Sequence, residues 1–215
     1  MWSYWRDDFA EYGSWSGEVS PTSGVHFHTE HQLTFVISGC RYFKLGGENI
    51  CVTAGSCLFI PAGYPHGSLP ISHKGTRCLN VYSRTAEFGP HPLVLTFLPG
   101  QQHLAATVGA CFALEAADLP WRTESGGAEP QIADLSARVG LSREAFTRSF
   151  SRQVGIPPHA YRIVSRLNDA RQRLRDGDRL ADIAIDCGFF DQTHFARHFY
   201  RLFGATPGAY RKSIR

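Results

Sequence analysis

The sequence predicts an α+β protein of two domains, an all-β barrel followed by an all-α domain. Three observations carry this prediction. Short apolar segments punctuated by glycine and proline run through residues 32–82, which is typical of strands. From residue 131 onward the apolar residues follow a helical period, and part of that pattern is duplicated. The charge also changes along the chain, because residues 129–215 hold 15 of the 22 Lys and Arg residues but only 9 of the 19 acidic ones.

The composition excludes several classes of protein. Of the 215 residues 43% are hydrophobic, which favours a packed core over disorder. The acidic N-terminus MWSYWRDDFAEYG lacks the apolar region of a secretory signal, and no apolar run is long enough to span a membrane. The six cysteines form no C-x-x-C pair and are interpreted as reduced, buried side chains. We therefore expect a cytoplasmic protein without a membrane partner.

The all-β barrel is expected within residues 1–100. Segments rich in β-branched and aromatic residues are separated by turn-favouring residues such as Gly39, Gly47 and Gly63. Short strands with close turns are typical of a small sandwich or barrel. The strands expected from this pattern are residues 32–37, 42–45, 50–52, 57–60 and 79–82.

Residues 101–130 are expected to connect the two domains. The alanine-rich stretch 101–119 predicts a helix, and the Gly-, Ser- and Pro-containing stretch 123–130 predicts a linker. The all-α domain then covers residues 131–215.

The all-α domain contains a duplicated unit. The segment FTRSFSRQVGIPPHAYR at 146–162 aligns with FARHFYRLFGATPGAYR at 195–211, and nine of the 17 positions are identical. Upstream, Ala-Asp-Leu at 133–135 corresponds to Ala-Asp-Ile at 181–183. Two copies are too few for a solenoid, so the domain is predicted to hold two helix-turn-helix units.

Each unit has the sequence signals of a short helix, a tight turn and a second helix. In the first unit Gly140 supplies the backbone freedom of the turn, and Ser142 can cap the next helix. Gly188 and Asp191 hold the same places in the second unit. Phenylalanines at four-residue spacing are expected to face the core, namely Phe146 and Phe150 in the first unit and Phe195, Phe199 and Phe203 in the second.

A linker helix is predicted between the two units. Pro157 and Pro158 open it, and Gly177 ends it. It spans about 18 residues, or roughly 27 Å at ~1.5 Å per residue. That length is near the ~34 Å repeat of the DNA duplex, so this helix could hold two outward-facing helices in successive major grooves.

These stretches resemble the DNA-binding domain of the AraC/XylS family. The helix spacing, the turns and the closing Tyr-Arg pairs agree over residues 131–215. The resemblance implies that the second helix of each unit reads bases in a major groove. The residues at the matching positions are Glu144, Thr147 and Arg148 in the first unit, and Gln192, Thr193 and Arg197 in the second. Arg152 and Arg201 are assigned to phosphate contacts or to pairing within the domain.

Two points about these helices stay open in the sequence. Arg148 and Arg197 recur at matching sites, so one or both could tie helices together rather than contact DNA. Glu144 could read a cytosine amino group or merely sit exposed near a helix N-terminus. The family also places a further helix directly before the first unit, where this chain has the linker 123–130. We therefore expect the first unit to be less well supported than the second.

Two segments of the N-terminal half resemble the sequence motifs of the cupin barrel. They are GVHFHTEHQLTFVISG at 24–39 and GSCLFIPAGYPH at 55–66. In metal-binding cupins the ligands are two histidines of an H-x-H pair, a glutamate and a later histidine. The matching residues here are His26, His28, Gln32 and His66, so a neutral glutamine stands in the place of the glutamate.

Two interpretations of the cupin-like pocket remain open. Histidines two apart on a strand point to the same face, and three imidazoles with an amide oxygen can hold a divalent metal. Alternatively, the same residues only hydrogen-bond a small effector, and no metal is involved. The residues expected to bind the effector are His26, His28, Gln32, Phe35, Tyr42, Tyr64 and His66, and the alternative for Phe35, Tyr42 and Tyr64 is that they simply pack the barrel.

Together the resemblances imply a sequence-specific transcription regulator, an activator by analogy with the family, and no enzymatic activity. A small effector in the barrel would shift the population of DNA-binding states. The implied partners are double-stranded DNA and the effector, with RNA polymerase and a second copy of the chain, paired through the barrel, as further partners. The alternative is a metal-dependent cupin enzyme, a dioxygenase or isomerase, for which the duplicated basic domain has no use. A third interpretation is a basic protein that binds nucleic acid without sequence preference.

Overall fold

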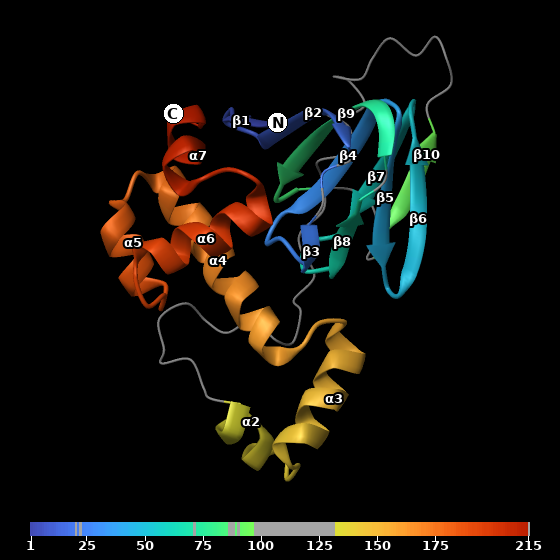
Figure 1. The fold of residues 1–215 in the computed structure, drawn as a ribbon. Helices are drawn as coiled ribbons and strands as arrows, with labels where there is room; N and C mark the ends of the chain where they lie inside the picture. The colour runs from blue at the N-terminus through green and yellow to red at the C-terminus, as the bar shows by residue number, and fades with distance from the viewer. Residues whose placement is uncertain are drawn as a thin grey trace.

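The computed structural model of the chain describes residues 1–19, 21, 23–70, 72–85, 89, 91–96 and 132–214. The strands all come first in the chain and the helices last, so the predicted α+β organisation in two domains is confirmed (Figure 1). The helix expected at 101–119 and the linker expected at 123–130 lie outside the described residues. No helix in the described part of the chain is long and apolar enough to cross a membrane.

The N-terminal domain consists of two antiparallel sheets. The larger sheet has the strand order β1-β2-β9-β4-β7-β10, and the smaller has the order β3-β8-β5-β6. The strands are β1 Trp2–Arg6, β2 Glu11–Val19, β3 Ser23–His26, β4 His31–Ser38, β5 Cys40–Leu45, β6 Glu48–Thr53, β7 Ser56–Ile60, β8 His66–Leu69, β9 Ser72–Ser83 and β10 Leu93–Thr96.

All five strands predicted from the sequence are present, as parts of β4, β5, β6, β7 and β9. The apolar core between the sheets includes Val36 and Leu58 of the larger sheet and Phe43 and Val52 of the smaller. Strands β1 and β2 were not expected. They add to the free edge of β9, and Tyr4 is the only residue of β1 that is buried, so the strand carries little apolar signal of its own.

The C-terminal domain is helical throughout its described part. The helices are α2 Ile132–Arg138, α3 Arg143–Val154, α4 Pro158–Asp176, α5 Leu180–Asp186, α6 Gln192–Phe203 and α7 Pro207–Ser213. Helices α2 and α3 form the first helix-turn-helix unit, and α5 and α6 form the second. Helix α4 joins the units, begins after Pro157 and ends at Gly177, as predicted.

The turns and caps inside the two units agree with the sequence signals. Gly140 and Gly188 have φ values of 67° and 73°, a backbone conformation that side chains with a Cβ atom rarely adopt. The Ser142 hydroxyl accepts from the backbone N–H of Ala145 at 3.2 Å. The Asp191 carboxylate accepts from the N–H of His194 at 2.6 Å. The second helix of each unit, α3 or α6, therefore begins at a cap that the sequence specifies locally. We call these two helices the predicted reading helices.

The second unit packs directly on the barrel. Tyr4 and Tyr82 of the larger sheet share one buried cluster with Phe195 and Phe199 of α6. The Tyr4 hydroxyl donates a hydrogen bond to the backbone carbonyl of Phe203 at 2.6 Å. The first unit lies at the far end of α4, where α2 and α3 extend away from the sheets (Figure 1).

Candidate DNA interface and interdomain cavity

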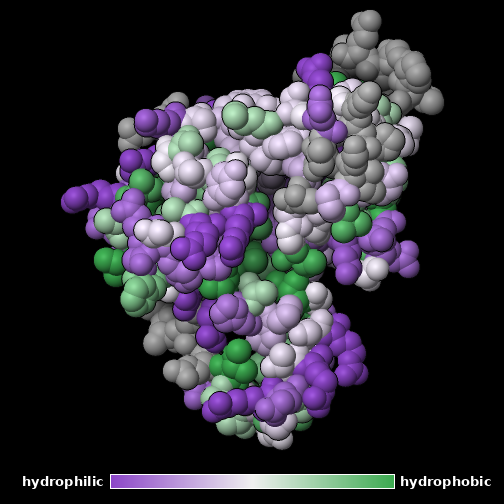
Figure 2. Space-filling model, in the orientation of Figure 1, coloured by the Kyte–Doolittle hydropathy of each residue, from purple (hydrophilic) through white to green (hydrophobic). Residues whose placement is uncertain are grey.

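Helix α3, the predicted reading helix of the first unit, presents most of its predicted DNA-binding residues to solvent. Glu144, Arg148 and Arg152 are exposed, and Thr147 is half-buried. Figure 2 shows hydrophilic side chains gathered where Figure 1 places this helix. Three of these four side chains are thus open to solvent, and their contacts with bases or phosphates remain predictions.

The reading helix of the second unit, α6, exposes Gln192, Thr193 and Arg197 near its N-terminus. Arg201 is also exposed, but it lies one turn further along and lines the mouth of a cavity shared with the barrel. The two ends of α6 thus have different surroundings. Its N-terminal part faces solvent, and its C-terminal part lies against the barrel.

The two reading helices differ in how well they are packed. Phe195, Phe199 and Phe203 of α6 are buried, as predicted. No residue of α3 is fully buried, and its Phe146 and Phe150 are only half-buried. The expectation of a less well supported first unit is therefore confirmed, whereas the expectation that its phenylalanines are core residues holds only in part.

A cavity of about 420 Å³ lies between the barrel and the C-terminal end of α6. Residues 200–204 of α6 and its C-cap form one side of it. A Cβ atom at Gly204 would collide with the Trp2 ring, and its φ of 70° also favours glycine, so the end of α6 sits directly on β1. The barrel side consists of Pro21, of aromatic residues, Trp2, Tyr4, Trp15 and Tyr82, and of polar residues, Ser23, His26, Gln32, Arg41, His66, Ser68 and Asn80.

The polar floor of the cavity is a connected hydrogen-bond network. Arg41 donates from Nη2 to the Ser68 hydroxyl at 2.7 Å and from Nη1 toward Asn80 Oδ1 at 3.4 Å. Asn80 also accepts from the Thr34 hydroxyl at 2.9 Å and donates to the Tyr82 hydroxyl at 3.0 Å. Buried polar groups that are bonded in this way hold fixed orientations, so the floor is a rigid set of polar groups.

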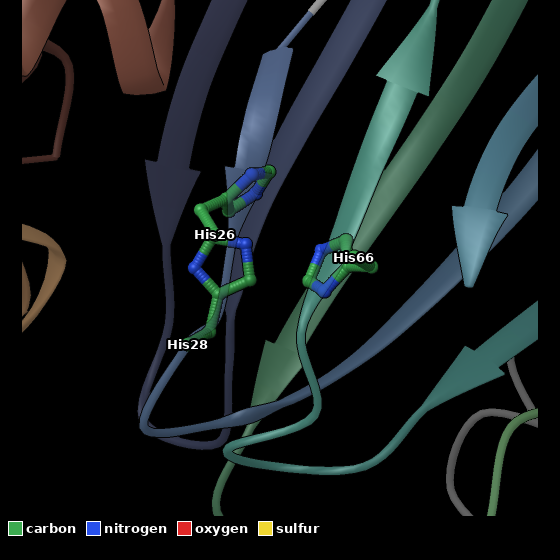
Figure 3. A group of neighbouring side chains, drawn as sticks. All are labelled: His26, His28 and His66. Atoms are coloured by element: carbon green, nitrogen blue, oxygen red, sulfur yellow. The ribbon is translucent and has the colours of Figure 1, made fainter. Parts of the chain in front are cut away.

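Three buried histidines lie together beside this floor. One ligand atom from each of His26, His28 and His66 can be chosen so that all lie within 4.8 Å of one another (Figure 3). Burial lowers the pKa of His26 to about 4 and holds the pKa values of His28 and His66 well below their usual range. The imidazoles are therefore neutral near pH 7, which is the form that binds metals.

The hydrogen bonds of the triad determine which ring nitrogens are available. Nδ1 of His26 and Nδ1 of His66 each lie within 2.9 Å of a backbone carbonyl, which can only accept. Nδ1 must then carry the proton, and Nε2 keeps its lone pair. Nε2 of His66 lies 3.2 Å from Oε1 of Gln32. The Gln32 amide donates from Nε2 to the Thr34 hydroxyl at 2.9 Å, so its Oε1 and the Nε2 lone pair of His66 face one another as two potential donors to a cation.

The structure separates the predicted pocket residues into two groups. His26, Gln32 and His66 line the cavity, and His28 completes the histidine triad. In contrast, Phe35, Tyr42 and Tyr64 are not among the described residues that line it, so their assignment to the cavity was wrong.

The alternation of side chains along a strand explains these errors. On β4, Gln32 and Thr34 face the cavity side, so Phe35 points to the opposite face and packs beside Leu33. On β5, Arg41 takes the inward position, and Tyr42, its neighbour, faces the other way. Tyr64 lies in the β7–β8 turn, against the apolar core between the sheets.

Sequence reasoning missed the residue that carries the charge of the cavity, Arg41. It stands in an apolar strand, CRYFKL, two residues before Phe43, and inward positions on a strand recur every second residue. Arg41 and Phe43 therefore face the same side of the strand, and the sequence could have predicted an inward-facing cation at position 41. Trp2 and the end of α6 could not be found in this way, because only the tertiary fold brings them to the cavity.

A buried ionic cluster fixes α4 to the barrel close to the cavity. Arg171 and Arg175 of α4 pair with Glu11 of β2 and with Glu30, and the Arg175 Nε to Glu11 Oε2 distance is 2.6 Å. Burial alone would raise the pKa of Glu30, but the two guanidinium groups outweigh it and lower that pKa to about 2. The Tyr210 hydroxyl of α7 also donates to Glu11.

Comparisons with known proteins agree with both halves of this description. Residues 135–213 match the family described as a helix-turn-helix domain, and residues 16–82 match the family described as a cupin domain. The probable transcriptional regulator LumQ of Photobacterium leiognathi is 36% identical over 85 residues, which are 39% of this chain and 34% of that protein. The transcriptional activator RhaS of Klebsiella pneumoniae is 34% identical over 90 residues, 41% of this chain and 32% of that protein.

The chain thus spans about a third of the length of these curated relatives. Among solved structures, ToxT from Vibrio cholerae has the same two-domain fold, with a TM-score of 0.58 over 96% of this chain and 99% of that one. Their sequence identity is 9%. A second ToxT structure, described as bound to an unsaturated fatty acid, gives a TM-score of 0.59 at 9% identity, over 97% of this chain and 96% of that one.

Proposed function

We propose that this chain, in which an AraC-type helix-turn-helix domain follows a cupin domain, is a sequence-specific transcription regulator that a small molecule controls. One observation carries the proposal. Residues 200–204, the end of the second predicted reading helix and its cap, form one wall of the cavity that the barrel lines on its other side. An occupant of the cavity therefore touches the helix that is expected to read DNA, and the sensing and reading parts share one surface.

The mechanism we propose is a shift between two docked arrangements of α6. An effector changes the equilibrium only by as much as its affinity differs between the two arrangements. Contacts with residues 200–204 supply such a difference, because these residues belong to the moving helix and not to the barrel. The direction of control is activation, by analogy with relatives such as RhaS. Contact with RNA polymerase, pairing of two copies through the barrel and action in the cytoplasm belong to the same proposal.

The first test is selection of bound duplexes from a random pool at about 0.15 M salt, which suppresses nonspecific binding. Two enriched boxes about one helical turn apart are expected if both reading helices contact bases. A single box would mean that only one unit reads DNA. Absence of any enriched box, with and without cell-extract metabolites, would contradict the proposal in favour of a nonspecific basic protein.

The histidine triad supports a second candidate function, the binding of a divalent metal ion. His26, His28 and His66 offer neutral imidazoles, and Gln32 Oε1 lies beside them as a fourth donor. Bound there, a metal would act as part of the sensor, or as the Lewis acid of a cupin enzyme. The duplicated helix-turn-helix domain favours the sensor, and turnover of an oxidisable substrate by the metal-loaded protein would favour the enzyme.

Calorimetric titration with Zn²⁺ and Mn²⁺ tests the metal candidate. We expect one ion per chain, and loss of that binding in His66→Ala. The matched control is His91→Ala, which removes an exposed histidine far from the triad in sequence. No binding, or equal binding by both variants, would leave the triad as a set of hydrogen-bonding residues only.

A further inference from the structure

We infer that the cavity binds a small organic anion, and that Arg41 holds its carboxylate group. This inference rests on the proposed function, because it names the chemical class of the effector. Three features support it, namely the isolation of the Arg41 charge, a described cavity lining that holds no acidic residue, and the aromatic residues that share this lining.

Arg41 is buried without a counter-charge from any residue that the structure describes. Only 2% of its surface is exposed, and its partners are the Ser68 hydroxyl, Asn80 Oδ1 and, at 3.6 Å, the Cys78 sulfur. Its Nε has no partner within the described residues. No carboxylate in that same set forms an ion pair with it. A charge in this position is costly unless a partner neutralises it.

The other buried arginines show what this protein does with such charges. Arg171 is also buried, the side chain of Arg175 is 9% exposed, and each pairs with both Glu11 and Glu30. Arg41 has ring faces instead, since its guanidinium carbon lies 4.5 Å from the Phe43 ring centroid. A ring face offsets a charge less completely than a carboxylate does. The missing carboxylate is the one that a ligand would bring.

The other residues that line the cavity also favour a negatively charged ligand. Its described lining includes a second cation, Arg201, and no aspartate or glutamate. The histidines that line it, His26 and His66, are engaged through Nδ1 with backbone carbonyls at 2.7 and 2.9 Å. Arg41 and Arg201 are therefore the charges that an entering molecule meets, and both attract an anion.

The body of the ligand is expected to be compact and apolar. Trp2 stacks on Tyr4 with ring centroids 5.8 Å apart, and Trp15 lies 5.6 Å from Trp2. These rings line the same cavity as the polar floor, and the Trp2 ring centroid lies 5.9 Å from the guanidinium carbon of Arg41. A cavity of about 420 Å³ is at the small end of the usual ligand-site range of about 300–1,000 Å³. An aromatic or short aliphatic monocarboxylate fits both the rings and the volume.

The test compares acids with their neutral amides, which differ in charge but hardly in shape. Benzoate, indole-3-acetate and octanoate, each beside its amide, are titrated into the EDTA-treated full chain by calorimetry. EDTA removes any metal from the triad, so that Arg41 is the deep cation of the site. Tryptophan fluorescence provides a second readout, because Trp2 and Trp15 line the cavity.

We expect at least one acid to bind at one molecule per chain, and its amide to bind at least about tenfold more weakly. Arg41→Gln should abolish binding of that acid, and Arg41→Lys should retain part of it. The matched control, Arg6→Gln, removes an exposed cation of the same domain and should leave the affinity unchanged. If Arg41→Gln fails to fold, the acid–amide pairs and Arg41→Lys still test whether Arg41 binds the carboxylate.

Three outcomes would overturn the inference. They are no binding of any of the three acids, equal binding of acid and amide, and unchanged binding by folded Arg41→Gln. Duplex selection with the same preparations separates this failure from that of the proposed function. A protein that enriches two DNA boxes but binds no acid remains a regulator with a different effector, whereas one that enriches none fails the proposed function itself.

Discussion

The two helix-turn-helix units share nine of 17 aligned residues, yet the structure packs them in different ways. In the second unit the phenylalanines of α6 are buried in a cluster that includes Tyr4 and Tyr82 of the barrel. In the first unit α3 has no fully buried residue, and Val139 and Leu141 are exposed. Similar sequence thus specifies the local motif, whereas tertiary contacts decide how firmly each copy is held.

This difference suggests a division of roles between the units. The second unit is an extension of the barrel's core, so a change in the cavity reaches it directly. The first unit is tied to the barrel near the start of α4, through a small cluster of Phe27, Ile156 and Val164. We therefore expect an effector to alter reading by α6 more than reading by α3.

The largest expected effect comes from truncating equivalent core residues of the two units. Phe199→Ala removes a fully buried ring and is expected to lower the free energy of unfolding by about 3–5 kcal/mol. Phe150→Ala, at the matching position, removes a half-buried ring and should cost roughly half as much. Urea unfolding of both variants measures the difference. Equal losses would mean that the first unit is as well packed as the second.

The second prediction concerns the ionic cluster that fixes α4 and the second unit to the barrel. Glu30 has its pKa lowered from 4.5 to about 2 in the folded protein, so its pairing stabilises the fold above pH 4.5. That stability is lost as the pH falls toward 2, and it amounts to about 3 kcal/mol from the size of the shift. Glu30→Gln should be less stable than the wild type at pH 7, and this deficit should shrink in acid.

The measurement is unfolding free energy against pH for the wild type and two variants. The buried histidines have lowered pKa values, so the free energy of unfolding also decreases as the pH falls below about 6.5. This decrease is the same in every variant and does not affect the comparison. The exposed Glu48→Gln serves as the matched control and should follow the wild type. A deficit of Glu30→Gln that persists unchanged below pH 3 would show that the pairing is not what Glu30 contributes.

Features that depend on nearby residues could be predicted from the sequence, whereas contacts between distant residues could not. Ser142 and Asp191 could be assigned as caps because a cap depends on residues two or three positions away. Phe35 was placed in the cavity wrongly, although the alternation along β4 from Gln32 excludes it. The docking of the second unit was not predictable, because Tyr4 and Glu11 meet partners 199 and 160 residues along the chain. Such pairs leave no local pattern.

The third prediction compares the two reading helices on DNA. Arg148→Ala and Arg197→Ala are each expected to cost about 1–3 kcal/mol of binding and to relax one base position, in different boxes. Arg201→Ala should weaken all sequences alike and flatten the salt slope by about one unit if it contacts phosphate. Binding isotherms on the selected duplex and its single-base variants distinguish these cases. Uniform weakening by Arg197→Ala would mean that this residue positions α6 without reading a base.

The smallest expected effect comes from removing the N-cap hydrogen bond of α3 or of α6. Ser142→Ala removes a neutral cap with a distance of 3.2 Å, and Asp191→Ala removes a charged cap with a distance of 2.6 Å. An N-cap contributes about 0.5–2 kcal/mol, and a carboxylate also interacts favourably with the helix dipole. We expect Asp191→Ala to cost more, and its loss to appear in global unfolding because α6 belongs to the barrel's core. Ser142→Ala should instead appear as faster amide hydrogen exchange confined to α3. If Ser142→Ala lowered global stability as much as Asp191→Ala, the first unit would be coupled to the rest of the fold more tightly than its burial indicates.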